Sequence, residues 1–168
     1  VGYAISDSPA PAPHNLRTWA NAAGLPASVE IVYKASEDET FWAHYWRGGI
    51  VCLMEILCGE VPEHIWIEAP RNWPREHVLA VLYHEIGHYF QYHSGLPPNE
   101  WDADIRSARQ LCSMDLNGPE LVAGALTAVT GSAKKDSPAH GNHYRRVDHI
   151  RQYGCRGTGL GLLPLLQS

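Results

Sequence analysis

The spacing of hydrophobic and polar positions changes about midway along the chain. In the first half, short apolar runs rich in β-branched residues are separated by Gly and Pro, a pattern that predicts strands. We expect strands over residues 29–33, 50–57 and 64–68. Residues 15–23, followed by Gly24 and Pro26, are expected to form a short helix, and residues 37–45 another.

The second half has longer segments with the periodicity of helices. Pro74 suits the first position of a helix that runs to about His93, where Gly95 and two prolines stop it. Three more helices are expected, over residues 99–114, 120–130 and 142–153. The remaining segments are a Pro-rich extended lead-in (1–13), a polar loop (131–141) and an apolar tail (155–168).

Strands followed by helices indicate a single α+β domain over residues 1–168, a length that suits one hydrophobic core. The net charge of -5 and the lack of a basic cluster argue against nucleic-acid binding. No run approaches the roughly 18 apolar residues of a membrane span, so membrane association is expected only through segments absent from this chain.

The four cysteines (Cys52, Cys58, Cys112 and Cys155) show no CxxC spacing, which argues against a zinc ribbon. Two alternatives stay open for them. They form two disulfides in an oxidising compartment, or they are buried free thiols.

The stretch Tyr83–His88 contains an HExxH motif, His84-Glu-Ile-Gly-His88. On a helix, residues four apart lie about 40° apart around the axis, so His84 and His88 project side by side and can bind one Zn²⁺. Glu85 points roughly 100° away from His84. It can therefore reach a water on the metal without being a ligand, as a general base must.

Three features around the motif support this interpretation. Gly87 costs a helix about 1 kcal/mol relative to Ala, which is reasonable if another element or a substrate approaches closely there. Residues 64–68 form the extended segment expected to pair with a substrate. The helix has an apolar stripe that leaves the histidines facing a cleft, formed by Val78, Leu79, Leu82, Ile86, Tyr89 and Phe90.

A catalytic zinc has a third protein ligand and an open fourth position. Gln91 and Ser94 stand where a metzincin has Gly and a metal ligand, which excludes that class. Downstream, Glu100 and Asp104 are four apart and share a helix face. We expect Glu100 to bind the metal and Asp104 to accept a hydrogen bond from a zinc histidine. Asp102 remains an alternative third ligand.

HExxH followed by Glu100-Trp-Asp-Ala-Asp104 resembles the ExxAD helix of the gluzincins, and is most similar to the HtpX and CAAX-prenyl-protease type and the small minigluzincins. The resemblance covers residues 64–150. It implies a zincin-like fold with a small N-terminal sheet, an active-site helix, a glutamate helix and further C-terminal helices. It also extends to His140 and Arg146, six residues apart, although Gly141 replaces the usual Pro.

The resemblance implies a zinc metalloendopeptidase with a peptide or protein substrate. Zinc activates a water, and Glu85 takes its proton and returns it to the leaving amine. One residue of the C-terminal group stabilises the oxyanion, or the group only caps a helix; its members are His140, His143, Tyr144 and Arg146.

Three other interpretations are kept. ImmA/IrrE-type peptidases also combine HExxH with an acidic helix, but this chain has Asp102 where they have Glu and lacks their FAxxLL continuation. The domain can instead be a non-catalytic zinc-bearing module, or a protease restrained by its own N-terminal segment.

His93 is expected to end its helix rather than bind metal, and Trp66 or Trp73 is a candidate for a substrate groove.

Overall fold

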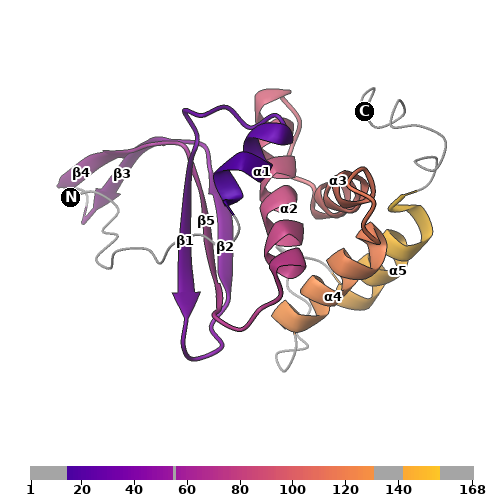
Figure 1. Ribbon diagram of the computed structural model, residues 1–168. Coiled ribbons are helices and arrows are strands. Elements are labelled where there is room, and N and C mark those ends of the chain that lie inside the picture. The colour runs from indigo at the N-terminus through magenta and orange to yellow at the C-terminus, as the bar shows by residue number, and fades with distance from the viewer. Residues whose placement is uncertain (1–14, 55, 131–141, 156–168) are drawn as a thin grey trace. The chain divides into compact units, whose positions relative to one another are not determined.

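The computed structural model describes residues 15–54, 56–130 and 142–155. The expected lead-in, the loop at 131–141 and almost all of the tail lie outside these residues. The fold is mixed α+β, a small sheet followed by helices, as predicted (Figure 1). The chain divides into two compact units, residues 1–73 and 74–168.

The described part of the first unit contains one helix, a three-stranded sheet and a hairpin. In the sheet, β5 lies between β1 and β2, parallel to β1 and antiparallel to β2. The bounds are α1 Leu16–Ala22, β1 Glu30–Ser36, β2 Trp42–Trp46, β3 Gly49–Leu53, β4 Leu57–Val61 and β5 His64–Pro70. The core of this unit includes Leu16, Ala20, Val29, Val61, Ile65 and Ile67.

Three expectations for this unit are wrong. Residues 37–45 contain no helix; instead β2 begins at Trp42, because its alternating aromatic residues suit a strand and β5 supplies the pairing partner. Residues 64–68 do form a strand, but β5 pairs on both edges, so its backbone groups are not available to a substrate strand. The edge strands of the sheet are β1 and β2.

The expected single strand over 50–57 is also wrong, because the chain reverses at Met54, whose φ is 55°. The result is the β3–β4 hairpin, which continues the β2 and β5 strands beyond the sheet (Figure 1). Cys52 lies opposite Cys58 in the register, and the two form a disulfide across the hairpin.

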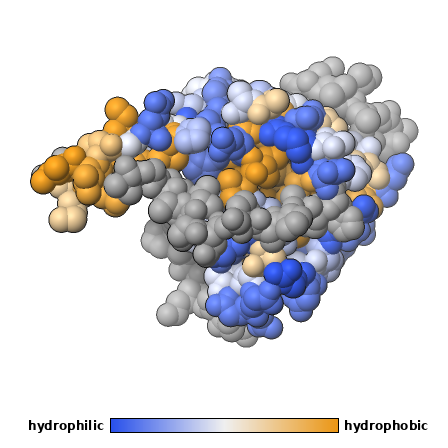
Figure 2. Space-filling view, turned by 60° about the vertical axis from the view of Figure 1, so that its left-hand side comes forward, coloured by the Kyte–Doolittle hydropathy of each residue, from blue (hydrophilic) through white to orange (hydrophobic). Residues whose placement is uncertain are grey.

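The hairpin carries a concentration of exposed apolar side chains, visible as an apolar region in Figure 2. The residues with their exposed fractions are Ile50 (74%), Leu53 (51%), Met54 (85%), Ile56 (83%) and Leu57 (52%). No helix among the described residues combines the length and apolar character needed to cross a membrane.

The described part of the second unit is helical. α2 packs on α3 and α4, and α3 and α4 each also contact α5. The bounds are α2 Arg75–His93, α3 Glu100–Cys112, α4 Gly118–Thr130 and α5 His143–Tyr153. These agree with the expected helices to within about two residues, with Pro74 as the N-cap of α2 rather than its first residue. The core includes Leu79, Leu82, Ala108, Leu111, Val122 and Ile150.

The burial of α2 differs from the expected single stripe. Six consecutive residues from Val78 to Tyr83 are buried, and together they face every side of the helix. Tyr89 and Phe90, expected in the stripe, are only half-buried. The apolar pattern identified the helix correctly but not the extent of its burial.

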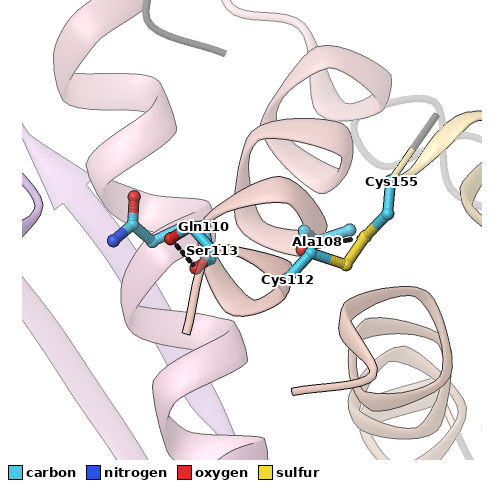
Figure 3. The surroundings of a disulfide bond; sticks show 5 residues. All are labelled: Ala108, Gln110, Cys112, Ser113 and Cys155. Atoms are coloured by element: carbon cyan, nitrogen blue, oxygen red, sulfur yellow. Dashed lines mark hydrogen bonds between the residues drawn. A yellow bond between two sulfur atoms is a disulfide. The ribbon is translucent and has the colours of Figure 1, made fainter. Parts of the chain in front are cut away.

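A second disulfide joins Cys112 at the end of α3 to Cys155, just beyond α5 (Figure 3). Sγ of Cys155 also lies 3.4 Å from the carbonyl oxygen of Ala108. The bond spans a sequence separation of 43 residues. A loop of this length corresponds to about 4 kcal/mol of stabilisation in the chain-entropy description of disulfides. All four cysteines are therefore paired, which answers the alternative left open by the sequence.

Candidate metal centre

Three side chains of the second unit bring ligand atoms to one point. Nε2 of His84 lies 3.1 Å from Nε2 of His88. The carboxylate of Glu100 contacts both rings, with one oxygen 3.1 Å from His84 Nε2 and the other 3.2 Å from His88 Nε2. Among the described residues, this group of two histidines and one carboxylate is suited to hold a metal ion.

The outer nitrogen of His84 is held by a buried carboxylate. Nδ1 of His84 lies 2.9 Å from Oδ1 of Asp104, which is 2% exposed. Arg146, also buried, donates to both oxygens of Asp104 at 2.8 Å. Asp104 is therefore ionised and can only accept, so Nδ1 of His84 carries the hydrogen. The hydrogen bond expected between Asp104 and a motif histidine is present.

The outer nitrogen of His88 is held by an amide. Its Nδ1 lies 2.8 Å from Oε1 of Gln91. The same oxygen accepts from the backbone N–H of Asn99 at 3.1 Å, and Nε2 of Gln91 donates to the Asn99 carbonyl at 2.9 Å. These two backbone contacts require the oxygen of the amide to face His88. Nδ1 of His88 is therefore the donor.

With both Nδ1 atoms protonated, each neutral ring presents its Nε2 lone pair to the other and to Glu100. Two lone pairs and a carboxylate at this separation repel unless a metal ion or a proton lies between them. Ligands of a tetrahedral zinc with bonds of about 2.0–2.1 Å are about 3.3 Å apart. The distances of 3.1–3.2 Å between the three ligand atoms agree with that geometry. The donor set therefore fits a zinc-sized cation.

The electrostatics of the centre favour positive charge. Burial lowers the pKa of His84, but the hydrogen bonds to Asp104 and Glu100 outweigh it and raise the pKa to about 10. Burial raises the pKa of Glu100, yet its hydrogen bonds to His84 and His88 bring the pKa well below its usual range. Because the pKa of His84 is raised, metal and proton compete for the centre.

Glu85 is 6% exposed and lies close enough to raise the pKa values of His84 and Arg146 through its charge. Asp102, the alternative ligand, lies outside the group. One of its carboxylate oxygens accepts from Gln91 and from Arg106. Of the two candidates for the third ligand position, the structure brings Glu100 to the histidines.

The C-terminal candidates separate into three cases. Arg146 lies in the centre, where its guanidinium bonds Asp104 and also lies 3.4 Å from Glu100. Tyr144 is 62% exposed, and its ring packs against that of His143 at the start of α5. His140 lies outside the described residues. Arg146 is thus well placed to hold carboxylates, a role that differs from the expected contact with an oxyanion.

The remaining candidates lie elsewhere in the chain. His93 is the last residue of α2, exposed, with its ring against Tyr89, so it is a helix-end residue as expected. Trp73 stacks on Phe41, and Trp66 is a half-buried residue of β5. A groove role for either tryptophan stays a prediction.

Gly87 allows α3 to approach α2 closely. A Cβ added at Gly87 would lie 3.2 Å from Cα of Ala103, which is tighter than an ordinary contact. Ala103 belongs to the same helix as Glu100 and Asp104. The close approach anticipated from this glycine is therefore that of the helix carrying the candidate third ligand.

We expect Gly87→Ala to weaken metal binding by about tenfold. Alanine favours the helix by about 1 kcal/mol, but the added methyl pushes α3, and Glu100 with it, away from the histidines. Zinc titration measures the loss of metal affinity, and a thermal melt of the metal-free protein measures the change in stability. Unchanged zinc affinity in Gly87→Ala would show that α3 does not need this contact to place Glu100.

No protein-family model, curated protein or solved structure matches this chain. The case for a function therefore depends on the site itself.

One residue of the centre was not identified as functional from the sequence. In the sequence, Gln91 served only to exclude a metzincin. Its signal was its position three residues after His88, which places both side chains on one helix face. A polar residue at that spacing is a candidate partner for the outer nitrogen of the ligand.

Proposed function

We propose that this chain is a zinc-dependent peptidase that hydrolyses peptide bonds, with Glu85 as general base. One observation carries the proposal: the lone pairs of His84 and His88 converge with the carboxylate of Glu100, while hydrogen-bond acceptors hold both outer nitrogens. Such partners orient the rings and set their tautomers in zinc sites.

The donor set supports zinc in a catalytic rather than a purely structural role. Two histidines and one glutamate form a known ligand set of zinc peptidases, and three protein ligands leave a coordination position for water or substrate. The side chains of His84, His88 and Glu100 remain 15%, 14% and 21% exposed, so the group is not sealed from solvent. The charged groups around the site are the carboxylates of Glu85, Glu100 and Asp104 and the guanidinium of Arg146. Their formal charge adds up to −2, which a divalent cation would balance.

When bound here, zinc would supply a Lewis acid that lowers the pKa of water to about 7 and polarises the scissile carbonyl. The residues of this chain would do the rest. Glu85 adjoins a ligand on the same helix, so its carboxylate is suited to take a proton and deliver it to the leaving amine. Arg146 fixes Asp104, and Asp104 fixes His84, so the ligand geometry is set before substrate arrives.

The test combines metal content with hydrolysis of an unbiased peptide library. We expect one zinc per chain, loss of hydrolysis after removal by a chelator, and recovery on adding zinc back. X-ray absorption of the zinc-loaded protein would count its ligands. A fourth ligand from the chain and no hydrolysis would contradict the proposal and indicate the non-catalytic zinc-bearing module instead.

The choice of third ligand has its own test. We expect Glu100→Ala to weaken zinc binding by more than 100-fold, because it removes a ligand, a larger loss than the roughly 10–100-fold typical of the residues that hold ligands. Asp102→Ala should weaken it only a few-fold, because Asp102 acts through Gln91 and Arg106. Zinc titration of both variants decides the matter. A larger loss in Asp102→Ala than in Glu100→Ala would exchange the two roles.

A further inference from the structure

Gln91 has every hydrogen-bonding position of its side chain occupied while only 1% of its surface is exposed. Its oxygen accepts from His88 and from the backbone N–H of Asn99, and its nitrogen donates to the Asn99 carbonyl and, at 2.8 Å, to Asp102. These four bonds, to three residues, use both hydrogens of the amide nitrogen and both lone pairs of the amide oxygen.

These bonds reach two of the three proposed metal ligands. His88 is contacted directly, through the nitrogen that does not face the metal. Glu100 is reached through its neighbour: Gln91 holds both backbone groups of Asn99, and Asn99 is the N-cap of α3, with its side chain accepting from the N–H of Asp102. Glu100 is the first residue of α3 and directly follows the N-cap Asn99. Fixing the backbone of Asn99 therefore fixes the position from which the Glu100 side chain extends.

Resting on the proposed zinc site, we infer that Gln91 is a positioning residue that aligns His88 and Glu100 with each other across the connection between α2 and α3. Residues 94–98 are exposed, so little packing holds this turn. The three bonds of Gln91 to Asn99 and Asp102 instead tie the last turns of α2 to the first turn of α3 and fix the phase at which α3 begins.

The first experiment compares zinc affinity, by competition with a chromophoric chelator, between wild type, Gln91→Leu and the control Gln110→Leu. Gln91→Leu keeps the volume of the side chain and removes all four bonds. We expect it to lose about 10–100-fold in affinity and Gln110→Leu to lose none. The Co²⁺-loaded Gln91→Leu protein should also show shifted visible absorption bands, because the ligand geometry has changed. Wild-type affinity with an unshifted spectrum would overturn the inference.

A second pair of variants separates positioning from a loss of folding. Gln91→Glu keeps an acceptor for His88 and for the Asn99 N–H but sets a carboxylate against Asp102, so affinity should fall. Adding Asp102→Asn returns a donor facing position 91 and should recover part of the loss. If Gln91→Leu unfolds, this rescue decides: no recovery would overturn the inference. A wild-type chain that binds no zinc would instead overturn the proposed function, and this inference with it.

Discussion

Glu85→Gln is expected to abolish peptidase activity while zinc binding and folding are retained. The amide has nearly the same shape as the carboxylate but cannot take a proton from water, and a general base contributes about 10²–10⁴-fold to a rate. We therefore expect a fall of at least that size in kcat/KM. Zinc content and the circular dichroism spectrum should match those of wild type.

The matched control for this variant is Glu76→Gln, at the first turn of the same helix. It makes the same chemical change away from the metal centre and should keep full activity. Wild-type activity in Glu85→Gln would remove the residue from the role of base, whereas a loss of zinc in that variant would assign it a part in holding the metal.

His84→Ala and His88→Ala are each expected to abolish zinc binding under conditions where wild type is fully loaded. Each variant removes one of the three proposed ligands, so the loss should exceed that of any residue that only positions a ligand. Folding should survive, because Asp104 keeps Arg146 as a partner and Gln91 keeps Asn99. Elemental analysis of the purified variants gives the zinc content.

The control here is His93→Ala, which removes a histidine from the same helix. His93 is exposed at the end of α2 and should leave the zinc content unchanged. Unaltered zinc in both motif variants would contradict the assignment of the centre. Loss of zinc in the His93→Ala variant as well would point to a general disturbance of α2 rather than to removal of a ligand.

The sequence anticipated the helical half of the fold better than the strand half. The helices α2 to α5 lie close to their expected bounds, because helix signals such as Pro74 at the start and Gly95 after the end act over a few residues. Residues 37–45 were misassigned because a strand depends on a partner that the local pattern does not contain, and residues 50–57 because the chain reverses at Met54. Residue Trp42 begins a strand only through its pairing with β5.

The pairing of cysteines likewise needed the fold. The sequence left free thiols and disulfides as alternatives, since neither spacing nor composition specifies which side chains meet. Cys52 and Cys58 meet because the chain reverses between them, and Cys112 and Cys155 because α3 and α5 end near each other.

For the candidate centre, the sequence by itself determined whatever depends on a single helix. The four-residue spacing of His84 and His88 aligns their side chains on α2, and the same spacing puts Glu100 and Asp104 on one face of α3. Which acidic residue meets the histidines was decided only by the tertiary structure. The phase between the helices depends on the turn at residues 94–98 and on the bonds of Gln91 across it. Spacing along a helix gives directions about one axis, whereas a metal centre requires two axes to be aligned, and only packing and hydrogen bonds between helices can align them.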